Sequence, residues 1–374
     1  MKIGIITEYF PKTDDLEVKG GAEAAAFNEA YYLSKKHDIT VITSKEDNSK
    51  PYDKIGEINI IRCGRNRSYA HSGSFLDRLS FMKSAYISGK NLNFDIVTAY
   101  NFITYPVAWK LSQKLKIPCV SRYHDVWIGE WVKNVGLKGI TGEILERYTL
   151  SRDFDQIIAV SNFTKDKLKK YVPPEKLKVV PNIVELPTPH IEKFSNPTIC
   201  CVSRLVKYKR VDDLIKALFI VKKEIPDISC VIIGTGPQEN QLKNLVKQLK
   251  LEDNISFYGF VESHQKVLET IKASDAFCLA STVEGFGIVI VEAMALGIPF
   301  LASKILPIIE ASAGKGGLFF EPENYVELAG KIKLLITNDQ LKERLSQEGI
   351  QYSKRYKGER IALELEKIYE NLIN

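Results

Sequence analysis

The chain lacks long hydrophobic runs. Although 45% of its 374 residues are hydrophobic, none of its stretches reaches the ~18 consecutive apolar residues of a membrane-spanning helix. The N-terminal residues MKIGIITEYF begin a strand pattern and do not read as a signal peptide. We therefore expect a cytoplasmic protein.

The sequence also lacks paired cysteines. None of its six cysteines forms a CxxC motif, which argues against a zinc site and against a disulfide framework. Five lie in apolar, strand-like runs, and only Cys63 lies in a polar stretch. We expect these five cysteines to act as small buried hydrophobic side chains in a protein of a reducing compartment. The five are Cys119, Cys200, Cys201, Cys230 and Cys278.

There is little excess charge of either sign. The 52 basic and 46 acidic residues give a net charge of +6, which is too dilute over this length to demand nucleic acid as a partner. It permits an anionic membrane surface as a partner.

The length of the chain exceeds the ~250 to 300 residues at which single cores stop growing, so two domains are expected.

Short apolar runs rich in β-branched residues alternate with helical patterns, which predicts parallel sheets covered by helices on both faces. The first half supplies KIGIIT, DITVIT, INIIRC, FDIVTAY, IPCVSRYH and QIIAVS. The second supplies PTICCVS, ISCVIIG, ISFYGF, AFCLA and IPFLAS. A segment with four prolines, VVPNIVELPTPHIEKFSNP, separates the two sets.

We therefore predict an α/β protein of two doubly wound, Rossmann-like domains at residues 1–185 and 186–354. The stretch from Leu341 to the end is helical throughout, and its last part, about 355–374, is expected to pack back on the first domain. Two such domains would face each other across a cleft at the carboxyl ends of their strands, where ligands bind in open α/β folds.

The segment STVEGFGIVIVEAMALGIPF carries two carboxylates, Glu284 and Glu292. Glu292 lies within an otherwise apolar helix, and a buried carboxylate needs a partner. Glu284 precedes Gly285, Phe286 and Gly287, where a tight turn can direct N–H groups at an anion entering the helix N-terminus. The alternative is a solvated helix start followed by a core glutamate paired to a lysine.

Two cations lie where the second domain opens, in SRLVKYKR. Arg204 ends a strand and Lys209 follows five residues later, a pairing suited to a diphosphate. Two surface cations on a solvated turn is the alternative. Gly234 and Gly236 also follow a strand, but the third glycine of a GxGxxG fingerprint is missing, which makes a dinucleotide site a weak prediction.

In the first domain, Gly20 and Gly21 open an alanine-rich helix, where backbone can approach a phosphate or sugar, although a plain tight turn has the same pattern. His124 and Asp125 lie at the end of the strand IPCVSRYH that is expected to face the cleft. Asp153 and Asp155 form an Asp-x-Asp pattern immediately before the strand QIIAVS, opposite the expected site end. We interpret them as structural and expect no metal and no cofactor, because Arg204 and Lys209 suffice for charge neutralisation.

These motifs, in this order, resemble the retaining nucleotide-sugar glycosyltransferases of family 4, which share the two-domain GT-B fold. The resemblance covers GGAE, YHD, VSNFTKDKL, VVPN, SRLVKYKR, IIGTGP, YGFV and EGFGIVIVEAMALGIP. Asn182-Ile183-Val184-Glu185 stands where the family commonly has Asn-Gly-Val-Asp, which puts any role of that turn in nucleotide binding in doubt.

The resemblance implies a set of roles. Arg204 and Lys209 would bind the diphosphate, Glu292 the ribose hydroxyls, and Glu284 the donor sugar, with His124 nearby. The donor-binding set would further comprise Gly20, Gly21, Gly234, Phe260, Val261, Gly285, Phe286, Gly287 and Ile288. The implied activity is transfer, with retention and without a metal, from a UDP- or GDP-type donor to a hydroxyl acceptor, such as a lipid-linked or cell-surface glycan precursor. No side chain stands out as a nucleophile, so we expect front-face transfer.

Between Arg62 and Lys90, six cations accompany a single acid, Asp77, and are interleaved with apolar residues at helical spacing. One interpretation is a helix whose apolar stripe lies in the core. The other is docking on anionic lipid, with peripheral attachment at the inner face of the membrane. Trp127 and Trp131 would extend that surface or stack on an acceptor sugar.

Three other functions share parts of this pattern. A nucleotide-sugar epimerase of the same architecture would isomerise the sugar without releasing a diphosphate. A non-catalytic sugar-nucleotide binder is less favoured, because such proteins are typically exported and the N-terminal residues do not read as a signal peptide. A dinucleotide oxidoreductase is disfavoured by the missing glycine.

Overall fold

The computed structural model describes residues 1–12, 20–67, 75–184 and 191–374. It divides into two compact units. The first comprises Met1–Ile183 and Gly358–Asn374, and the second comprises Val184–Lys357. The predicted boundary at residue 185 falls outside the described residues. No helix in the described part of the chain is both long and apolar enough to cross a bilayer.

The first unit is built on an eight-stranded sheet of order β3-β4-β2-β1-β5-β6-β7-β8. All pairings are parallel except that of β3 with β4. The strands are β1 (Lys2–Ile6), β2 (Asp38–Glu46), β3 (Tyr52–Ile55), β4 (Ile58–Arg67), β5 (Ile96–Ala99), β6 (Cys119–Tyr123), β7 (Gln156–Ala159) and β8 (Leu177–Val179).

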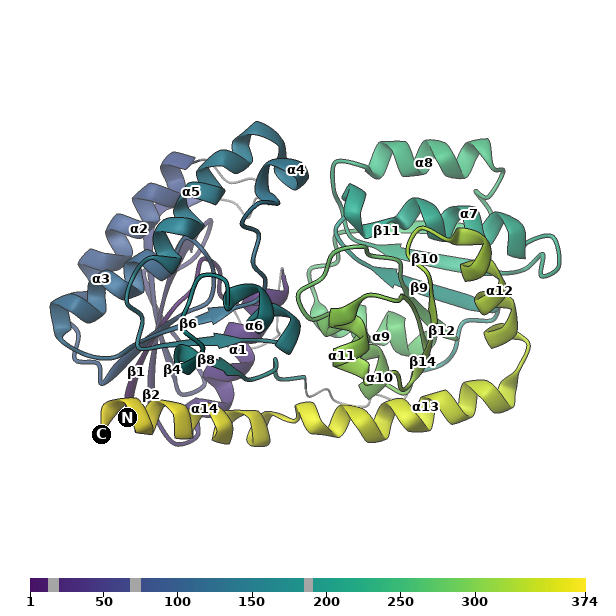
Figure 1. Cartoon of the computed structure of the whole chain (residues 1–374). Helices are drawn as coiled ribbons and strands as arrows, with labels where there is room; N and C mark the ends of the chain where they lie inside the picture. The colour runs from purple at the N-terminus through teal and green to yellow at the C-terminus, as the bar shows by residue number, and fades with distance from the viewer. Residues whose placement is uncertain (13–19, 68–74, 185–190) are drawn as a thin grey trace. The chain divides into compact units, whose positions relative to one another are not determined.

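Helices cover both faces of this sheet (Figure 1). One face packs on α1 (Gly21–Ser34) and α14 (Gly358–Ile373), which bury Leu33, Leu365 and Tyr369. The other packs on α2 (Phe75–Gly89), α3 (Tyr105–Leu115), α5 (Gly139–Leu150) and α6 (Asn162–Leu168). The short elements are α4 (Trp131–Val135), η1 (Gly136–Lys138) and η2 (Pro174–Lys176).

The second unit has a six-stranded, all-parallel sheet of order β11-β10-β9-β12-β13-β14. Its strands are β9 (Thr198–Val202), β10 (Ser229–Ile233), β11 (Ile255–Gly259), β12 (Ala276–Leu279), β13 (Phe300–Ser303) and β14 (Gly317–Phe320). Its helices are η3 (Lys207–Lys209), α7 (Val211–Val221), α8 (Glu239–Gln248), α9 (His264–Ala273), α10 (Ile288–Ala295), α11 (Leu306–Ser312), α12 (Tyr325–Ile336), α13 (Asp339–Ser353) and η4 (Lys354–Tyr356).

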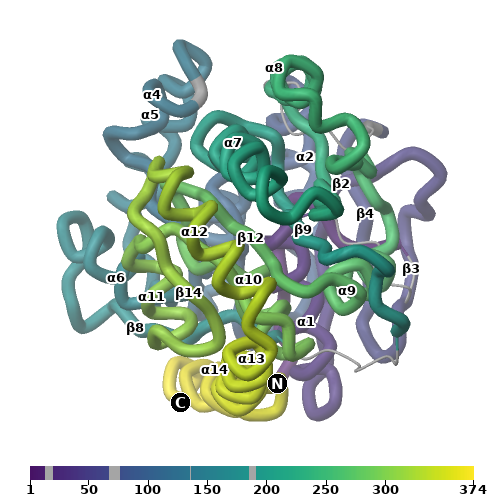
Figure 2. Tube along the Cα trace, turned by 90° about the vertical axis from the view of Figure 1, so that its right-hand side faces the viewer, coloured from purple at the N-terminus to yellow at the C-terminus, as the bar shows by residue number. Residues whose placement is uncertain are grey.

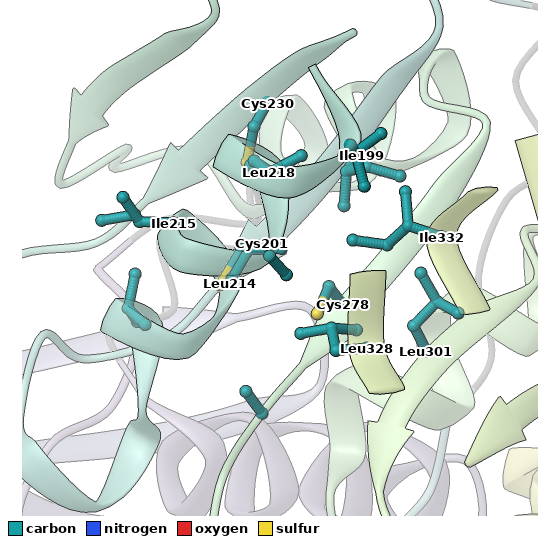
Figure 3. Close-up of a cluster of buried hydrophobic side chains, with 14 of the residues drawn as sticks. Ile199, Cys201, Leu214, Ile215, Leu218, Cys230, Cys278, Leu301, Leu328 and Ile332 are labelled. Carbon is teal, nitrogen blue, oxygen red and sulfur yellow. The ribbon is translucent and has the colours of Figure 1, made fainter. Parts of the chain in front are cut away.

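Helices lie on both faces of this sheet (Figure 2), and the core of the unit accordingly has two layers, one on each face. Helices α7, α8 and α12 pack on one face, and α9, α10 and α11 pack on the other. Figure 3 shows Cys201, Cys230 and Cys278 among leucine and isoleucine side chains of the first layer. All six cysteines are free and five are buried, which confirms their interpretation as small core residues. Burial raises the pKa of the Cys201 thiol to about 11.

Two parallel-sheet α/β units confirm the predicted fold class. Three strands were not predicted. β3 is a short polar strand at the sheet edge, β8 has three residues, and β14 follows two glycines. The prediction of a continuous helix at the C-terminus was wrong, because α13 ends at Ser353 and Lys357 is extended between η4 and α14. There Gly358 abuts Tyr32, where a Cβ would lie 2.1 Å from a ring carbon.

A buried polar cluster links the elements of the first unit. Arg122, the fourth of the five residues of β6, is fully buried. Its guanidinium donates to Glu29 of α1 and to the carbonyl oxygen of Val180 at 2.6 Å. The Tyr100 hydroxyl donates to the other Glu29 oxygen at 2.6 Å. Because each charge is paired and hydrogen-bonded, the cluster avoids the penalty of an isolated buried ion.

Candidate functional site

The order of the second sheet indicates where a site should lie. β9 and β12 are neighbours, and the strand order reverses between them. Loops that leave two such strands diverge to opposite sides of the sheet and leave a crevice at their carboxyl ends. Arg204 and Lys209 follow β9, and Glu284 follows β12. The residues predicted from the motifs therefore flank the reversal.

Lys209 and Glu284 are in direct contact. The Lys209 Nζ lies 2.5 Å from the Glu284 Oε1, and both side chains are largely buried. The two loops are also tied through backbone, because the Thr282 N–H donates to the Tyr208 carbonyl oxygen at 2.8 Å. An ammonium and a carboxylate that are 75 residues apart in the chain are thus brought together at one point.

Arg204 lies beside this pair and is exposed. Its Nη2 donates to the Tyr208 hydroxyl at 2.6 Å. Gly234 and Gly236 allow the loop after β10 to pack closely against the Arg204 segment. A Cβ on Gly234 would fall within 2.3 Å of the Ser203 carbonyl oxygen, and a Cβ on Gly236 would fall within 2.3 Å of the Leu205 carbonyl oxygen. These glycines support the position of Arg204 through close backbone packing.

Glu292 has a partner that the sequence did not suggest. The His264 Nε2 lies 3.1 Å from the Glu292 Oε1, whereas the alternative interpretation assigned a lysine. Burial disfavours a charged imidazole, but the Glu292 charge and hydrogen bond outweigh it and raise the pKa of His264. Within the described residues the buried Glu292 Oε2 has no hydrogen-bond partner. One oxygen of this carboxylate is therefore fixed, and the other lacks a donor among the described residues.

The glycine turn before α10 is a steric requirement. Gly287 has φ of +85°, a left-handed conformation, and a Cβ on it would lie 2.5 Å from the Ile308 side chain. Phe286 is buried, with its ring edge-on to Tyr356 at 5.5 Å. Gly285 and Ile288 flank these two residues at the N-terminus of α10, where backbone dipoles favour an anion.

Phe260 and Val261 follow β11 at the same edge of the sheet. Phe260 is exposed, and Val261 packs against the core. The preceding Gly259 accepts a hydrogen bond from the Gly234 N–H at 2.7 Å. The loops after β9, β10 and β11 are thereby connected in succession.

The remaining predicted residues belong to the first unit. Gly20 is the N-cap of α1 in an extended conformation that any residue adopts, and Gly21 is the first helical residue. His124 follows β6, with its ring 6.4 Å from that of Tyr100. Burial, with a smaller contribution from the Arg122 charge, lowers the pKa of His124 to about 3. This imidazole is therefore neutral at physiological pH.

Glu146, a second residue that sequence reasoning missed, supports the loop beyond His124. Its carboxylate accepts a hydrogen bond from the Trp131 Nε1 at 2.6 Å and from the Trp127 N–H at 3.2 Å. Burial raises the pKa of Glu146 to about 7, and these hydrogen bonds only partly oppose it. The Phe102 ring lies 5.0 Å from that of Trp131, so an aromatic cluster adjoins the end of β6.

The other acidic candidates have structural partners. Asp125 pairs with Lys167 at 2.9 Å. Asp153 pairs with Lys176, and Asp155 accepts from the Cys119 N–H at 2.8 Å, as expected of turn residues before a strand. Across the described ranges, no three His, Cys, Asp or Glu side chains gather in a way that could hold a metal ion.

Comparison with known proteins extends over nearly the whole chain. Residues 19–187 match Glycosyltransferase Family 4, and residues 187–352 match Glycosyl transferases group 1. An uncharacterized glycosyltransferase from Haemophilus influenzae is 27% identical over 352 residues, which is 91% of this chain and 94% of that protein. An alpha-monoglucosyldiacylglycerol synthase from Streptococcus pneumoniae is 25% identical over 395 residues, covering 96% of this chain and 84% of that protein.

Solved structures show the same fold. Sucrose-phosphate synthase from Thermosynechococcus elongatus superposes with a TM-score of 0.84 at 19% identity, over 99% of this chain and 98% of that one. HepE from Anabaena, solved in complex with UDP and glucose, gives a TM-score of 0.77 at 20% identity over the full length of both chains. With two successive family matches and two doubly wound units, the chain belongs to the family 4 glycosyltransferases of the GT-B architecture.

Proposed function

We propose that the protein transfers a sugar from a nucleoside-diphosphate sugar to a hydroxyl group, with retention at the anomeric carbon and without a metal ion. The observation that carries this proposal is the grouping at the β9–β12 reversal. There a Lys209–Glu284 ion pair and the exposed Arg204 adjoin a helix whose carboxylate, Glu292, has one oxygen with no donor in the part of the chain that the structure describes. A diphosphate supplies anionic oxygens for the cations, and a ribose supplies hydroxyl donors for the carboxylate.

The predicted residues nearest to the donor have the following roles in this proposal. Arg204 and Lys209 bind the diphosphate, and the Glu292 Oε2 accepts from a ribose hydroxyl. Glu284 and the backbone from Phe286 to Ile288 bind the donor sugar. Because His124 is uncharged at neutral pH, it would act as a hydrogen-bonding group beside that sugar, and we assign it no proton transfer.

The chemical step that we propose is front-face substitution. The bond between the anomeric carbon and the diphosphate oxygen breaks while a bond forms from the acceptor oxygen on the same face. The acceptor proton moves to the departing diphosphate oxygen. Arg204 and Lys209 stabilise the negative charge that develops on the leaving group, which requires no metal ion.

The donor and acceptor are proposed by similarity. HepE, solved with UDP and glucose, makes a UDP-sugar the first donor to test, with GDP-sugars beside it. The streptococcal relative is named as a synthase of a glycosylated diacylglycerol. We propose a lipid-linked or cell-surface glycan precursor as acceptor and a location at the inner face of the membrane.

The structure modifies the predicted membrane-facing segment at 62–90. Arg62 belongs to β4 and is buried, donating to the Phe10 carbonyl oxygen at 3.1 Å. Phe81 and Ala85 of α2 are in the core, whereas Leu76, Leu79 and Ile87 are exposed. One face of α2 therefore agrees with the core-helix interpretation, and the exposed apolar face is compatible with the proposed docking on lipid. Residues 68–74 and the side chains of Arg67 and Phe75 lie outside what the structure describes.

The test is release of nucleoside diphosphate from a panel of UDP- and GDP-sugars, with and without lipid-linked acceptors and with and without EDTA. We expect acceptor-dependent release from one donor, undiminished by the chelator. NMR of the product should show the donor's anomeric configuration. No release from any donor, or an inverted product, would overturn the proposal.

A further inference from the structure

Five large apolar side chains project into solvent from one short stretch of the first unit, α4 through α5. They are Val132, Leu137, Ile140, Ile144 and Tyr148, with exposed fractions of 46%, 81%, 47%, 63% and 38%. In α5, Ile140, Ile144 and Tyr148 are spaced four residues apart, so they lie within about 80° of arc and form a stripe ~12 Å long. The stretch forms a helical hairpin at one end of this unit (Figure 1).

The inward face of α5 shows that the outward stripe does not serve the core. Glu146 and Thr149 point inward with Gly142 and Leu150, and all four are buried. Gly142 lies directly under the Trp131 ring, since a Cβ there would be 2.6 Å from a ring carbon. A helix that buries a glutamate and exposes two isoleucines has the reverse of the usual pattern for a surface helix.

The charges on this surface are predominantly positive, because three cations accompany one partly exposed acid, Glu143. Lys133, Lys138 and Arg147 are exposed, and none of the exposed residues between Val132 and Tyr148 is acidic. Arg147 pairs with Glu143 at 2.6 Å. In the described part of the chain, Lys133 and Lys138 form no ion pair. Apolar side chains interspersed with unpaired cations are the composition that binds an anionic lipid interface.

We propose that this surface, comprising Val132, Lys133, Leu137, Lys138, Ile140, Ile144 and Tyr148, docks the protein on an anionic lipid bilayer. The exposed apolar groups enter the interface, and the lysines pair with lipid phosphates. As an account of how the enzyme reaches a lipid-linked acceptor, it rests on the proposed function. A protein partner would need acidic groups placed to match these lysines, whereas a bilayer supplies them at any position.

The position of the surface in the first unit supports this role. Trp131 begins α4 only seven residues after His124, and Glu146 of α5 holds both Trp127 and Trp131. The cluster also reaches α2, because the Arg78 guanidinium lies over the Phe102 ring, which packs on Trp131. A bilayer at α4–α5 would therefore lie beside the strand end that carries His124 and near the exposed Leu76 and Leu79.

Co-sedimentation of the full-length protein with lipid vesicles tests the proposal. Vesicles of phosphatidylglycerol mixed with phosphatidylcholine would be compared with vesicles of phosphatidylcholine alone, at low and high salt. We expect salt-sensitive binding that requires the anionic lipid. The double variant Leu137→Glu/Ile144→Glu should weaken binding about tenfold or more, and Lys133→Gln/Lys138→Gln should weaken it and reduce its salt dependence.

The matched control is Tyr52→Glu, which makes the same kind of change at a 75% exposed side chain of β3 and should bind as the wild type does. Circular dichroism and thermal melts establish that each variant is folded. Vesicle binding that survives both double variants, or is absent from the wild type at low salt, would overturn the proposal. Diphosphate release toward a detergent-dispersed acceptor, measured without vesicles, is a separate readout. Its absence from every donor while vesicle binding persists would refute the proposed function and leave the docking surface standing.

Discussion

At the scale of single residues, Lys209 and Glu284 share one ammonium-to-carboxylate contact of 2.5 Å. A diphosphate that binds Lys209 must compete with Glu284 for the same ammonium, and its higher charge favours the exchange. Glu284 is then free to accept hydrogen bonds from sugar hydroxyls. In the proposed function, the pair would thus couple diphosphate binding to the availability of the Glu284 carboxylate for the sugar.

Replacing this lysine tests its role. In Lys209→Ala we expect turnover to fall about 100-fold or more, as when one group that stabilises developing charge is removed, while the protein remains folded. The measurement is steady-state diphosphate release with the donor identified by the panel. Lys207→Ala, an exposed lysine of the same η3 turn, is the control and should retain its turnover. Near-normal turnover in Lys209→Ala would contradict the assignment.

His264 and Glu292 allow a test confined to the ribose. His264 fixes one Glu292 oxygen, so His264→Ala should misplace the other and weaken nucleoside diphosphate binding about tenfold, the equivalent of one charge-assisted hydrogen bond. The matching 2′,3′-dideoxy nucleotide lacks the hydroxyls in question and should bind both proteins within about twofold of each other.

Titration calorimetry with the two nucleotides gives all four affinities. Equal losses for both nucleotides in His264→Ala would mean that the histidine acts on the fold of the site and not on ribose recognition. His264→Gln keeps a side-chain donor and is expected to recover part of the affinity for the hydroxylated nucleotide.

At the scale of elements, Glu146 connects α5 to the loop after β6 and should give that loop a pH-dependent signal. Its folded pKa is about 7, above the ordinary value of 4.5. The native state therefore holds the proton more tightly, and the stability that this contributes is present below about pH 4.5 and is lost as the pH rises through 7. Above that pH, the ionised carboxylate accepts from both tryptophan N–H groups.

Tryptophan fluorescence should follow this titration with a midpoint near pH 7, and Glu146→Gln should flatten the curve. Trp109→Phe removes the only other tryptophan among the three in the chain and should keep the transition. Urea denaturation provides a second measure. From pH 5 to pH 8 the wild type should lose up to about 3 kcal/mol relative to Glu146→Gln. A transition that survives in Glu146→Gln would assign it to another group.

The elements also show what the sequence could reveal. Strands such as β1, β5 and β12 were predicted because both of their faces are buried, which produces continuous apolar runs. β3 has a polar sequence and pairs only at the edge, so it has no such run. The helix break at Lys357 could not be predicted from the local sequence, because it depends on the packing of Gly358 against Tyr32, which lies far away in the chain.

The residues of the candidate site also divide into those that the sequence could predict and those that it could not. Glu284, Gly287 and Glu292 could be found because they lie in one contiguous segment whose glycine and charge pattern is legible by itself. His264 and Glu146 could not. His264 meets a carboxylate 28 residues further along the chain, and Glu146 meets Trp131 from 15 residues away, with no periodicity that links them. Contacts of this kind depend on the fold and produce no pattern in the local sequence.

At the scale of the whole molecule, the first unit is discontinuous in the chain. Its core is completed by α14, which follows the entire second unit. Ile361, Leu365 and Tyr369 are buried against α1 and the first sheet. At roughly 2–5 kcal/mol for each large apolar side chain removed from a core, losing all three approaches the total stability of a typical domain.

Deleting residues 358–374 should therefore unfold the first unit and leave the second unit folded, since the second has its own two-layered core. We expect calorimetry to lose one of two transitions and sugar transfer to disappear. Nucleoside diphosphate binding should persist, because Arg204, Lys209, Glu284 and Glu292 all belong to the second unit.

Leu365→Ala should lower only the first-unit transition. Leu363→Ala, at an exposed position of the same helix, should change neither. If the shortened chain kept both transitions, α14 would be an accessory to the first unit, and the burial of its three core residues would have to be offset by rearrangement of α1.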